Sequence, residues 1–199
     1  IHRDIKPANF LIYYSPPLPL SPLSDTIKDP LLNCSTKKEK AKSRYTVKLC
    51  DFGMSKPYAK FEINTPRVVT YRYRPPEIVL GMNYDYKIDV WSMGCVIYEM
   101  IMQEPMFTIE EEKKNGEKMA KCEKPEEIIK ELIKNSPFPL SNDDKALIKT
   151  RFNISFKKND ISTITKELKK DELLYDLLKG MLCFNPVNRF TSSQCLDHA

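Results

Sequence analysis

The feature that most constrains the fold is a long run of residues that is apolar on almost every side. It extends from Lys87 to Met102 and contains Trp91 and Gly94. A surface helix has a single apolar stripe, whereas a helix that is apolar all round is packed on every side. The run therefore predicts a helix at the centre of a helical domain.

Size and charge set further limits on what the chain can be. With 199 residues, of which 41% are hydrophobic and 30% are charged, the chain can bury one core of globular type. The formal net charge of +5 is small and spread along the chain, which argues against a nucleic-acid partner. No apolar run approaches the roughly 20 residues that cross a membrane, so we also expect no membrane partner. Because the first residues do not resemble a signal peptide and Ile1 is not an initiator, we expect the chain to be part of a longer intracellular polypeptide.

The cysteines predict reduced thiols and not a metal site. None of them forms a C-x-x-C pair, and the chain has only two histidines that could join them as zinc ligands. The six positions are Cys34, Cys50, Cys95, Cys122, Cys183 and Cys195.

Two strand-like runs, Phe10–Tyr13 and Tyr45–Leu49, flank a segment of different composition. Residues 13–44 begin with closely spaced prolines and end in the basic run Lys37–Arg44. We interpret the whole as a β-hairpin whose turn is expanded into a long surface insertion. The alternatives are a proline-motif ligand or a nuclear-localisation-like basic patch, so both cytoplasm and nucleus are open as locations.

The rest of the chain predicts helices separated by one charged stretch. We expect a second, solvated insertion at about 109–124, then a helix that begins at Pro125. Residues 171–182 show a further helical stripe, and Thr191 with Gln194 resembles a capping box that opens a last helix. The buried stripes are expected at Ile128, Ile129, Leu132 and Ile133, and at Leu173, Leu174, Leu177, Leu178 and Met181. The expected fold class is mainly α with a small β-hairpin near its start.

Two motifs carry the chemistry. The first, His2–Asn9, reads His-Arg-Asp-Ile-Lys-Pro-Ala-Asn, and the second, Asp51–Gly53, reads Asp-Phe-Gly. Phosphoryl transfer from ATP needs a group that orients the attacking hydroxyl and oxygen ligands for metal ions on the phosphates. Asp4 can accept the hydroxyl proton, and Asn9 and Asp51 can hold magnesium. The structural alternative is that Asp-Phe-Gly is an ordinary turn and that the aspartates cap helices.

Together these motifs resemble the eukaryotic protein kinase family. The order of the remaining matches supports this: Pro75-Pro76-Glu77 stands where kinases have Ala-Pro-Glu, Asp89-x-Trp91-x-x-Gly94 lies in the central helix, and Arg189 follows Asn185-Pro186. The resemblance implies a kinase-like C-lobe, ATP and Mg²⁺ as cofactors, and phosphoryl transfer to serine or threonine.

A longer stretch narrows the resemblance. Val68–Glu77 is similar to the segment of cyclin-dependent and mitogen-activated kinases that precedes and includes Ala-Pro-Glu. Thr65 falls where these kinases carry their activating threonine, and Arg67 replaces the tyrosine of the mitogen-activated T-x-Y, so the cyclin-dependent type fits better. Arg72 and Pro75 depart from the pattern, where tryptophan and alanine are usual.

The resemblance also implies a role for each residue of the two motifs and their neighbours. Lys6 would balance charge on the transferred phosphate, and Thr70 would hydrogen-bond both Asp4 and Lys6. Arg3 would pair with phosphate on Thr65 through charge-assisted hydrogen bonds.

Five further positions are implied to shape the substrate pocket or to support the fold. Val69 and Arg74 would form the pocket for a proline that follows the acceptor residue. Glu77 and Arg189 would form a buried pair, and Asp89 would hold the backbone of the catalytic loop. For His2 we expect a packed structural histidine and not a base, and for Cys50 a small buried thiol and not a reactive one.

The sequence lacks the parts that an N-lobe supplies. Its five glycines form no G-x-G, and no β3 lysine or partner glutamate is present, so residues 1–199 are expected to be a partial kinase domain with the N-lobe absent. One hypothesis is that the chain is a fragment of an active, proline-directed Ser/Thr kinase. Its substrates would be proteins with Ser-Pro or Thr-Pro sites, and an activating kinase or a cyclin-like subunit would regulate it. The alternative is a non-catalytic interaction module. In either case the fragment by itself is expected to transfer phosphate poorly.

Overall fold

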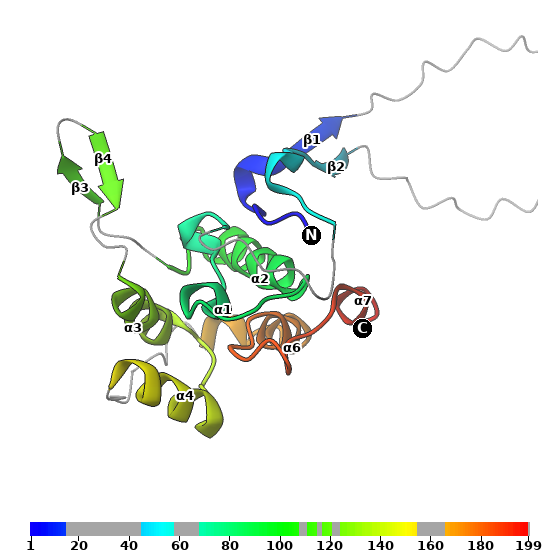
Figure 1. The fold of residues 1–199 in the computed structure, drawn as a ribbon. Coiled ribbons are helices and arrows are strands. Elements are labelled where there is room, and N and C mark those ends of the chain that lie inside the picture. The colour runs from blue at the N-terminus through cyan, green and yellow to red at the C-terminus, as the bar shows by residue number, and fades with distance from the viewer. Residues whose placement is uncertain are drawn as a thin grey trace, which may run out of the picture. The chain divides into compact units, whose positions relative to one another are not determined.

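A computed structural model describes residues 1–14, 45–57, 68–107, 111–114, 117–120, 124–154 and 166–198. In these ranges the chain is mainly helical, with two separate two-stranded antiparallel sheets (Figure 1). It divides into two compact units, the first made of Ile1–Pro7 and Asp51–Ala199 and the second of Ala8–Cys50. The expected fold class, mainly α with a small β-hairpin, is confirmed. No helix among the described residues is both long and apolar enough to span a membrane.

The described part of the second unit is a β-hairpin. Strand β1 (Phe10–Tyr14) follows a short 3-10 turn, η1 (Pro7–Asn9), and pairs antiparallel with β2 (Tyr45–Leu49), which confirms the two predicted strands. At the end of the ladder, the Cys50 amide donates to the carbonyl of Asn9 at 2.9 Å. Residues 15–44, with the proline-rich and basic motifs, lie outside the described residues.

One face of this hairpin carries only apolar and aromatic side chains. Residues directly opposite each other in a ladder project to the same face. The pairs Phe10–Leu49, Ile12–Val47 and Tyr14–Tyr45 alternate with the others, so all six share one face. Ile12 and Val47 are 72% and 61% exposed, so this apolar face is largely open to solvent.

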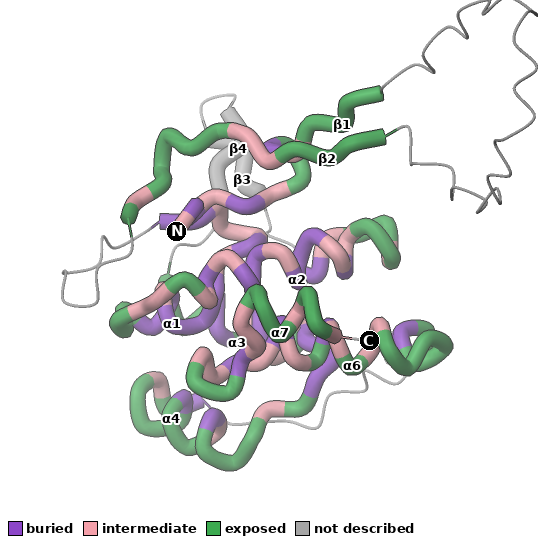
Figure 2. The backbone as a smooth tube through the Cα atoms, turned by 90° about the vertical axis from the view of Figure 1, so that its right-hand side faces the viewer, coloured by how far each residue is buried: buried purple, intermediate pink, exposed green. Residues whose placement is uncertain are grey.

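The first unit is built around α2 (Lys87–Met102), the helix predicted to be central. Figure 2 shows buried residues along most of its length, and Trp91 is only 2% exposed. The last turn differs from the prediction, because Met100 and Ile101 face solvent. The helix ends where Gln103 takes a left-handed conformation with φ of 58°.

Several shorter helices belong to the same unit. They are α1 (Pro76–Val79), α3 (Pro125–Asn135), α6 (Glu172–Met181) and α7 (Ser192–Leu196), with α6 packed against α2 and α1 against α3. The predicted start at Pro125 and the capping box of Thr191 and Gln194 are both confirmed.

The two predicted stripes are buried only in part. In α3, Ile128, Ile129 and Leu132 are buried, but Ile133 is only half-buried. In α6, Leu178 and Met181 are buried and Leu174 and Leu177 are half-buried, whereas Leu173 is 60% exposed because it lies in the first turn on the solvent side. The prediction that Leu173 is buried was therefore wrong.

Two elements were not expected. Helix α4 (Asn142–Phe152) begins with a capping box formed by Ser141 and Asp144. The charged stretch expected to be a loop contains a hairpin of β3 (Glu111–Lys114) and β4 (Glu117–Ala120), so that prediction was wrong for these residues. The sequence signal was Asn115-Gly116 between the strands, a dipeptide favoured in two-residue hairpin turns.

Candidate active site

Three side chains of the first unit form a hydrogen-bonded cluster at the His-Arg-Asp motif. The Lys6 ammonium donates to Asp4 Oδ2 at 2.7 Å and to Thr70 Oγ1 at 3.4 Å. The Thr70 hydroxyl donates to the other carboxylate oxygen, Asp4 Oδ1, at 2.5 Å. The contacts expected among these three residues are present, although Thr70 is 66 positions from Asp4 in the chain.

The protonation of Asp4 follows from this environment. Burial raises the pKa of the carboxyl, but the hydrogen bonds from Lys6 and from Thr70 lower it more, so the pKa lies below its ordinary value. Asp4 is thus an anion at neutral pH. A carboxylate of low pKa is a weak base, so its geometry suits holding a hydroxyl in position and accepting its proton late, as the hydroxyl oxygen forms its new bond.

A carboxylate on the central helix fixes the backbone of this motif. Asp89, in the first turn of α2, accepts from the His2 amide at 2.7 Å and from the Arg3 amide at 2.9 Å. Arg3 has a φ of 69°, a left-handed conformation that costs a non-glycine residue roughly 1–2 kcal/mol. The two hydrogen bonds to Asp89 hold that conformation, and this is the contact that the sequence predicted for Asp89.

The arginine side chain ties the motif to the segment after Asp-Phe-Gly. Arg3 is 8% exposed and its Nε donates to the Met54 carbonyl at 2.6 Å. His2 is buried and lies edge-on to Phe52 with 4.9 Å between ring centroids, which agrees with a packed structural role. The sequence did not identify Met54 or Phe52 as partners, because neither a hydrogen bond to a backbone carbonyl nor an edge-on ring contact requires a particular residue type. Thr65, the expected phosphate partner of Arg3, lies outside the described residues.

The two residues expected to hold magnesium lie in different units. Asp51, in the first unit, has a φ of 61°, and its Oδ1 accepts from the Gly53 amide at 3.3 Å. Within the described residues, Asp51 Oδ2 accepts no hydrogen bond, so an exposed carboxylate oxygen is open to a cation. Asn9, in the second unit, is 5% exposed. Carboxylate and amide oxygens are the donors that Mg²⁺ takes in proteins, so these residue types fit the ion.

Next to Thr70, the carbonyl of a valine with strained backbone accepts hydrogen bonds from an arginine. Val69 has a φ of 71° and is 5% exposed. Arg74 donates to the Val69 carbonyl through Nε at 3.1 Å and through Nη2 at 3.0 Å. A guanidinium fork that binds one oxygen twice leaves that carbonyl with little capacity for an N–H of a passing polypeptide.

Glu77 and Arg189 form the buried ion pair that the sequence predicted. Their side chains are 1% and 0% exposed, with N···O distances of 2.6 and 2.9 Å. Arg189 also donates to the carbonyls of Cys183 at 3.0 Å and Phe184 at 3.2 Å, and its guanidinium lies 5.0 Å from the Trp91 ring centroid. Nη1 also donates to the Lys87 carbonyl at 3.1 Å, so every N–H group of this guanidinium has an acceptor, as a buried cation requires.

Comparison with known proteins supports the family suggested by the motifs. The family model described as "Protein kinase domain" matches residues 1–199. Mitogen-activated protein kinase 5 of Oryza sativa subsp. indica is 29% identical over 199 residues, which cover all of this chain and 44% of that protein. Cyclin-dependent kinase G1 of Arabidopsis thaliana is 31% identical over 202 residues, which cover all of this chain and 28% of that protein. The chain therefore spans less than half the length of these relatives.

A solved structure shows the same fold. The crystal structure of the yeast RNA Pol II CTD kinase CTDK-1 complex matches with a TM-score of 0.66 and 21% identity, over all of this chain and 54% of that one. This likeness concerns the fold.

Proposed function

Since this chain belongs to the protein kinase family, we propose that it carries the catalytic residues of an enzyme that transfers phosphate from ATP to serine and threonine hydroxyls. The observation that carries the proposal is the cluster of Asp4, Lys6 and Thr70. It combines a carboxylate that can hold a hydroxyl with a cation two residues away that can face the phosphate.

In the proposed reaction the acceptor hydroxyl donates a hydrogen bond to Asp4. As the oxygen attacks phosphorus, Asp4 accepts the proton, while the ammonium of Lys6 offsets negative charge on the transferred group. Thr70 keeps the Asp4 carboxylate in its orientation. Asn9 and Asp51 would hold Mg²⁺, which when bound neutralises charge on the ATP phosphates.

The surroundings of Val69 support a preference for proline directly after the acceptor. Arg74 already donates two hydrogen bonds to the Val69 carbonyl. The backbone N–H of a substrate residue next to this carbonyl therefore cannot use it as an acceptor. An ordinary residue there leaves a desolvated N–H without a partner, and proline has no N–H to lose. We therefore propose Ser-Pro and Thr-Pro as the substrate class.

We also propose that the enzyme is switched on by phosphate on Thr65, which Arg3 would bind through charge-assisted hydrogen bonds. The upstream partner would be an activating kinase, and a cyclin-like subunit is proposed from the similarity to cyclin-dependent kinases. A cytoplasmic or nuclear location fits both partners. Treatment with an activating kinase should raise the activity of the natural protein and leave that of Thr65→Ala unchanged; full activation of Thr65→Ala would refute this step.

The test of the catalytic proposal uses the full-length natural polypeptide that contains this chain. Its transfer of phosphate from Mg²⁺-ATP is measured on two peptides that differ only in Ser-Pro against Ser-Ala. We expect at least a tenfold preference for Ser-Pro, and a loss of about 10²–10⁴-fold in kcat for Asp4→Asn. Asp197→Asn, an exposed aspartate at the end of α7, is the matched control and should keep full activity.

Two results would contradict the proposal. Equal rates on the two peptides would remove the proline preference but leave the kinase assignment. A native polypeptide that neither binds Mg²⁺-ATP nor transfers phosphate would instead support the non-catalytic interaction module.

A further inference from the structure

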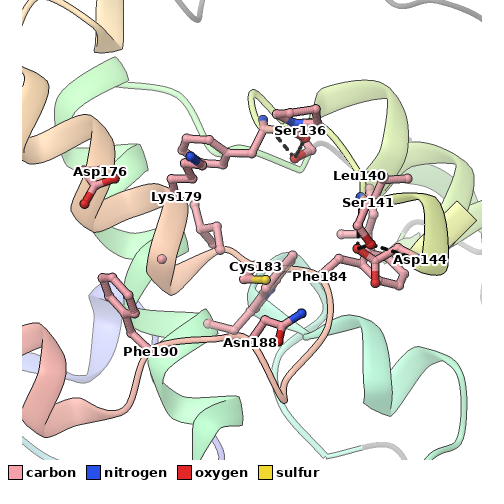
Figure 3. A pocket seen from close by; sticks show the side chains of 16 residues that line it. Ser136, Leu140, Ser141, Asp144, Asp176, Lys179, Cys183, Phe184, Asn188 and Phe190 are labelled. Atoms are coloured by element: carbon pink, nitrogen blue, oxygen red, sulfur yellow. Dashed lines mark hydrogen bonds between the residues drawn. The ribbon is translucent and has the colours of Figure 1, made fainter.

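A cavity of about 310 Å³ lies in the first unit, away from the catalytic cluster. Its walls are the loop between α3 and α4 on one side and the C-terminal half of α6 with the following loop on the other (Figure 3). None of Asp4, Lys6 and Thr70 lines it. Its volume is at the lower end of the range for sites that hold small ligands or single side chains.

One wall carries a buried carboxylate without a cation. Asp144 is 6% exposed, and both of its acceptor contacts, from the Ser141 amide at 3.2 Å and the Ser141 hydroxyl at 2.7 Å, go to Oδ2. Among the described residues no donor contacts Asp144 Oδ1, and no lysine or arginine lies within 4.0 Å of this carboxylate. Oδ1 is not fully buried, so it remains accessible to a donor that enters the cavity.

The remaining lining determines which cation fits. Aromatic rings from three segments line the cavity, and the two acidic lining residues, Asp144 and Asp176, outnumber the one basic residue, Lys179. Lys179 lies on the wall opposite Asp144 (Figure 3). The aromatic lining residues are Trp91, Phe138, Phe184 and Phe190.

Aromatic rings and a carboxylate in one cavity favour a guanidinium as the bound cation. Its planar group stacks on rings, donates in a fork to carboxylate oxygens and is more weakly hydrated than an ammonium. The protein already uses this chemistry once, where Arg189 contacts both Glu77 and the Trp91 ring. The aliphatic part of an arginine side chain also matches the apolar walls of the cavity.

We propose that this cavity is a docking site for a partner polypeptide that inserts one arginine side chain, with the guanidinium bound to Asp144. The rim is open to an incoming chain, since Asp176, Lys179 and Asn188 are all exposed. The site would recruit a partner at a distance from the catalytic residues, and its occupancy does not require catalysis.

The test measures binding directly and uses the full-length natural polypeptide. The probe is the blocked tripeptide acetyl-Ala-Arg-Ala-amide, and its matched analogue carries citrulline, which keeps the shape of arginine but removes its charge. Saturation-transfer NMR should show saturable binding of the arginine probe with Kd on the order of 1 mM. The citrulline analogue should bind at least tenfold more weakly.

Two protein variants locate the site. Asp144→Asn should weaken the arginine probe at least tenfold, because it removes the charge while the amide oxygen can still accept from Ser141. Asp143→Asn is the control: it lies on the same helix, changes the net charge equally and does not line the cavity. It should change Kd less than twofold, and both variants should keep the circular dichroism of the parent.

Several outcomes would overturn the proposal. They are equal binding of arginine and citrulline probes, no saturable binding at 10 mM probe (about ten times the expected Kd), or equal effects of Asp143→Asn and Asp144→Asn. Free arginine that binds as well as the tripeptide would overturn a polypeptide as the occupant. Since binding is read without ATP, failure here leaves the proposed kinase activity untouched, and failure of the kinase assay leaves this site untouched.

Discussion

At the scale of single residues, two opposing effects act on the pKa of Asp4. Its burial favours the neutral acid, and the donors Lys6 and Thr70 favour the anion and prevail. Each donor contacts a different carboxylate oxygen, so the loss of one leaves the other in place. Removing one donor at a time should therefore raise the pKa of Asp4 in separate steps.

Replacing Thr70 with valine should raise the pKa of Asp4. The hydroxyl that donates at 2.5 Å is lost, whereas burial persists. The acid limb of the kcat/KM profile against pH should then move to higher pH in the full-length enzyme. Thr150→Val is the matched control, because Thr150 is an exposed threonine of α4 whose hydroxyl donates to the Ala146 carbonyl, within its own helix. An unchanged acid limb in Thr70→Val would show that Asp4 does not set it.

The same pKa has a consequence for stability. Because the folded-state pKa of Asp4 lies below the ordinary value of 3.8, its ionisation stabilises the folded state above that pH. This contribution is lost as pH falls through the folded-state pKa. In Thr70→Val the loss should begin at higher pH, which urea denaturation between pH 2 and about 5 would detect.

Motif recognition located the members of the catalytic cluster and the supporting role of Asp89, but not every contact that holds them. The positive φ of Val69 and the capture of its carbonyl by Arg74 depend on backbone geometry that valine disfavours, so residue preferences point the other way. Likewise, the contact between Arg3 and the Met54 carbonyl involves an atom common to every residue. Such contacts come from the tertiary fold.

At the scale of elements, helix starts were predictable where a cap and a stripe coincide. Pro125 opens α3 and the Thr191 capping box opens α7 as the sequence indicated. Helix α4 was missed because three of its four apolar residues, Ala146 to Ile148, are consecutive and therefore project in different directions around the helix. Its one clear signal was Ser141 followed three positions later by Asp144.

In α6, Gly180 allows the Phe190 ring to lie close to the helix backbone, and an alanine at this position should prevent that contact. A Cβ atom at this position would lie 2.2 Å from Cε2 of Phe190. Alanine gains about 1 kcal/mol in helix propensity, but overpacking of this kind typically costs about 1–3 kcal/mol, so we expect a net loss of stability for Gly180→Ala. Urea denaturation should show it, with the exposed neighbour Lys179→Ala as control. A more stable Gly180→Ala would mean that the Phe190 ring moves aside freely.

At the scale of the whole molecule, a buried ion pair joins positions 112 residues apart. Glu77→Gln removes the charge that compensates Arg189, and we expect it to lower the free energy of unfolding by about 3–5 kcal/mol. Glu126→Gln breaks an exposed pair with Lys130, at 2.8 Å one helical turn away, and should leave the free energy of unfolding almost unchanged. Similar losses for the two variants, in the same urea experiment, would contradict a structural role for the buried pair.

The apolar face of the β1–β2 hairpin predicts self-association of the 199-residue chain. Among the described residues each strand of this hairpin has one edge without a strand partner, and long exposed apolar faces with such edges favour pairing between copies. Ile12→Thr combined with Val47→Thr should reduce the associated fraction in sedimentation velocity. Lys48→Thr, on the opposite face, should leave it unchanged or raise it, and equal effects of the two changes would exclude this face as the cause.

The distance between Glu77 and Arg189 along the chain also bears on how the protein is made. Glu77 leaves the ribosome 112 residues ahead of its partner, so at about 5–20 residues per second it waits roughly 6–22 s for the arginine. During that interval α1 holds a carboxylate that cannot be buried favourably, and the elements that close over it stay accessible to chaperones and proteases. The first unit therefore completes its core only after most of the chain has been translated, and substitutions that slow this last step should lower the yield of protein in cells more than its final stability suggests.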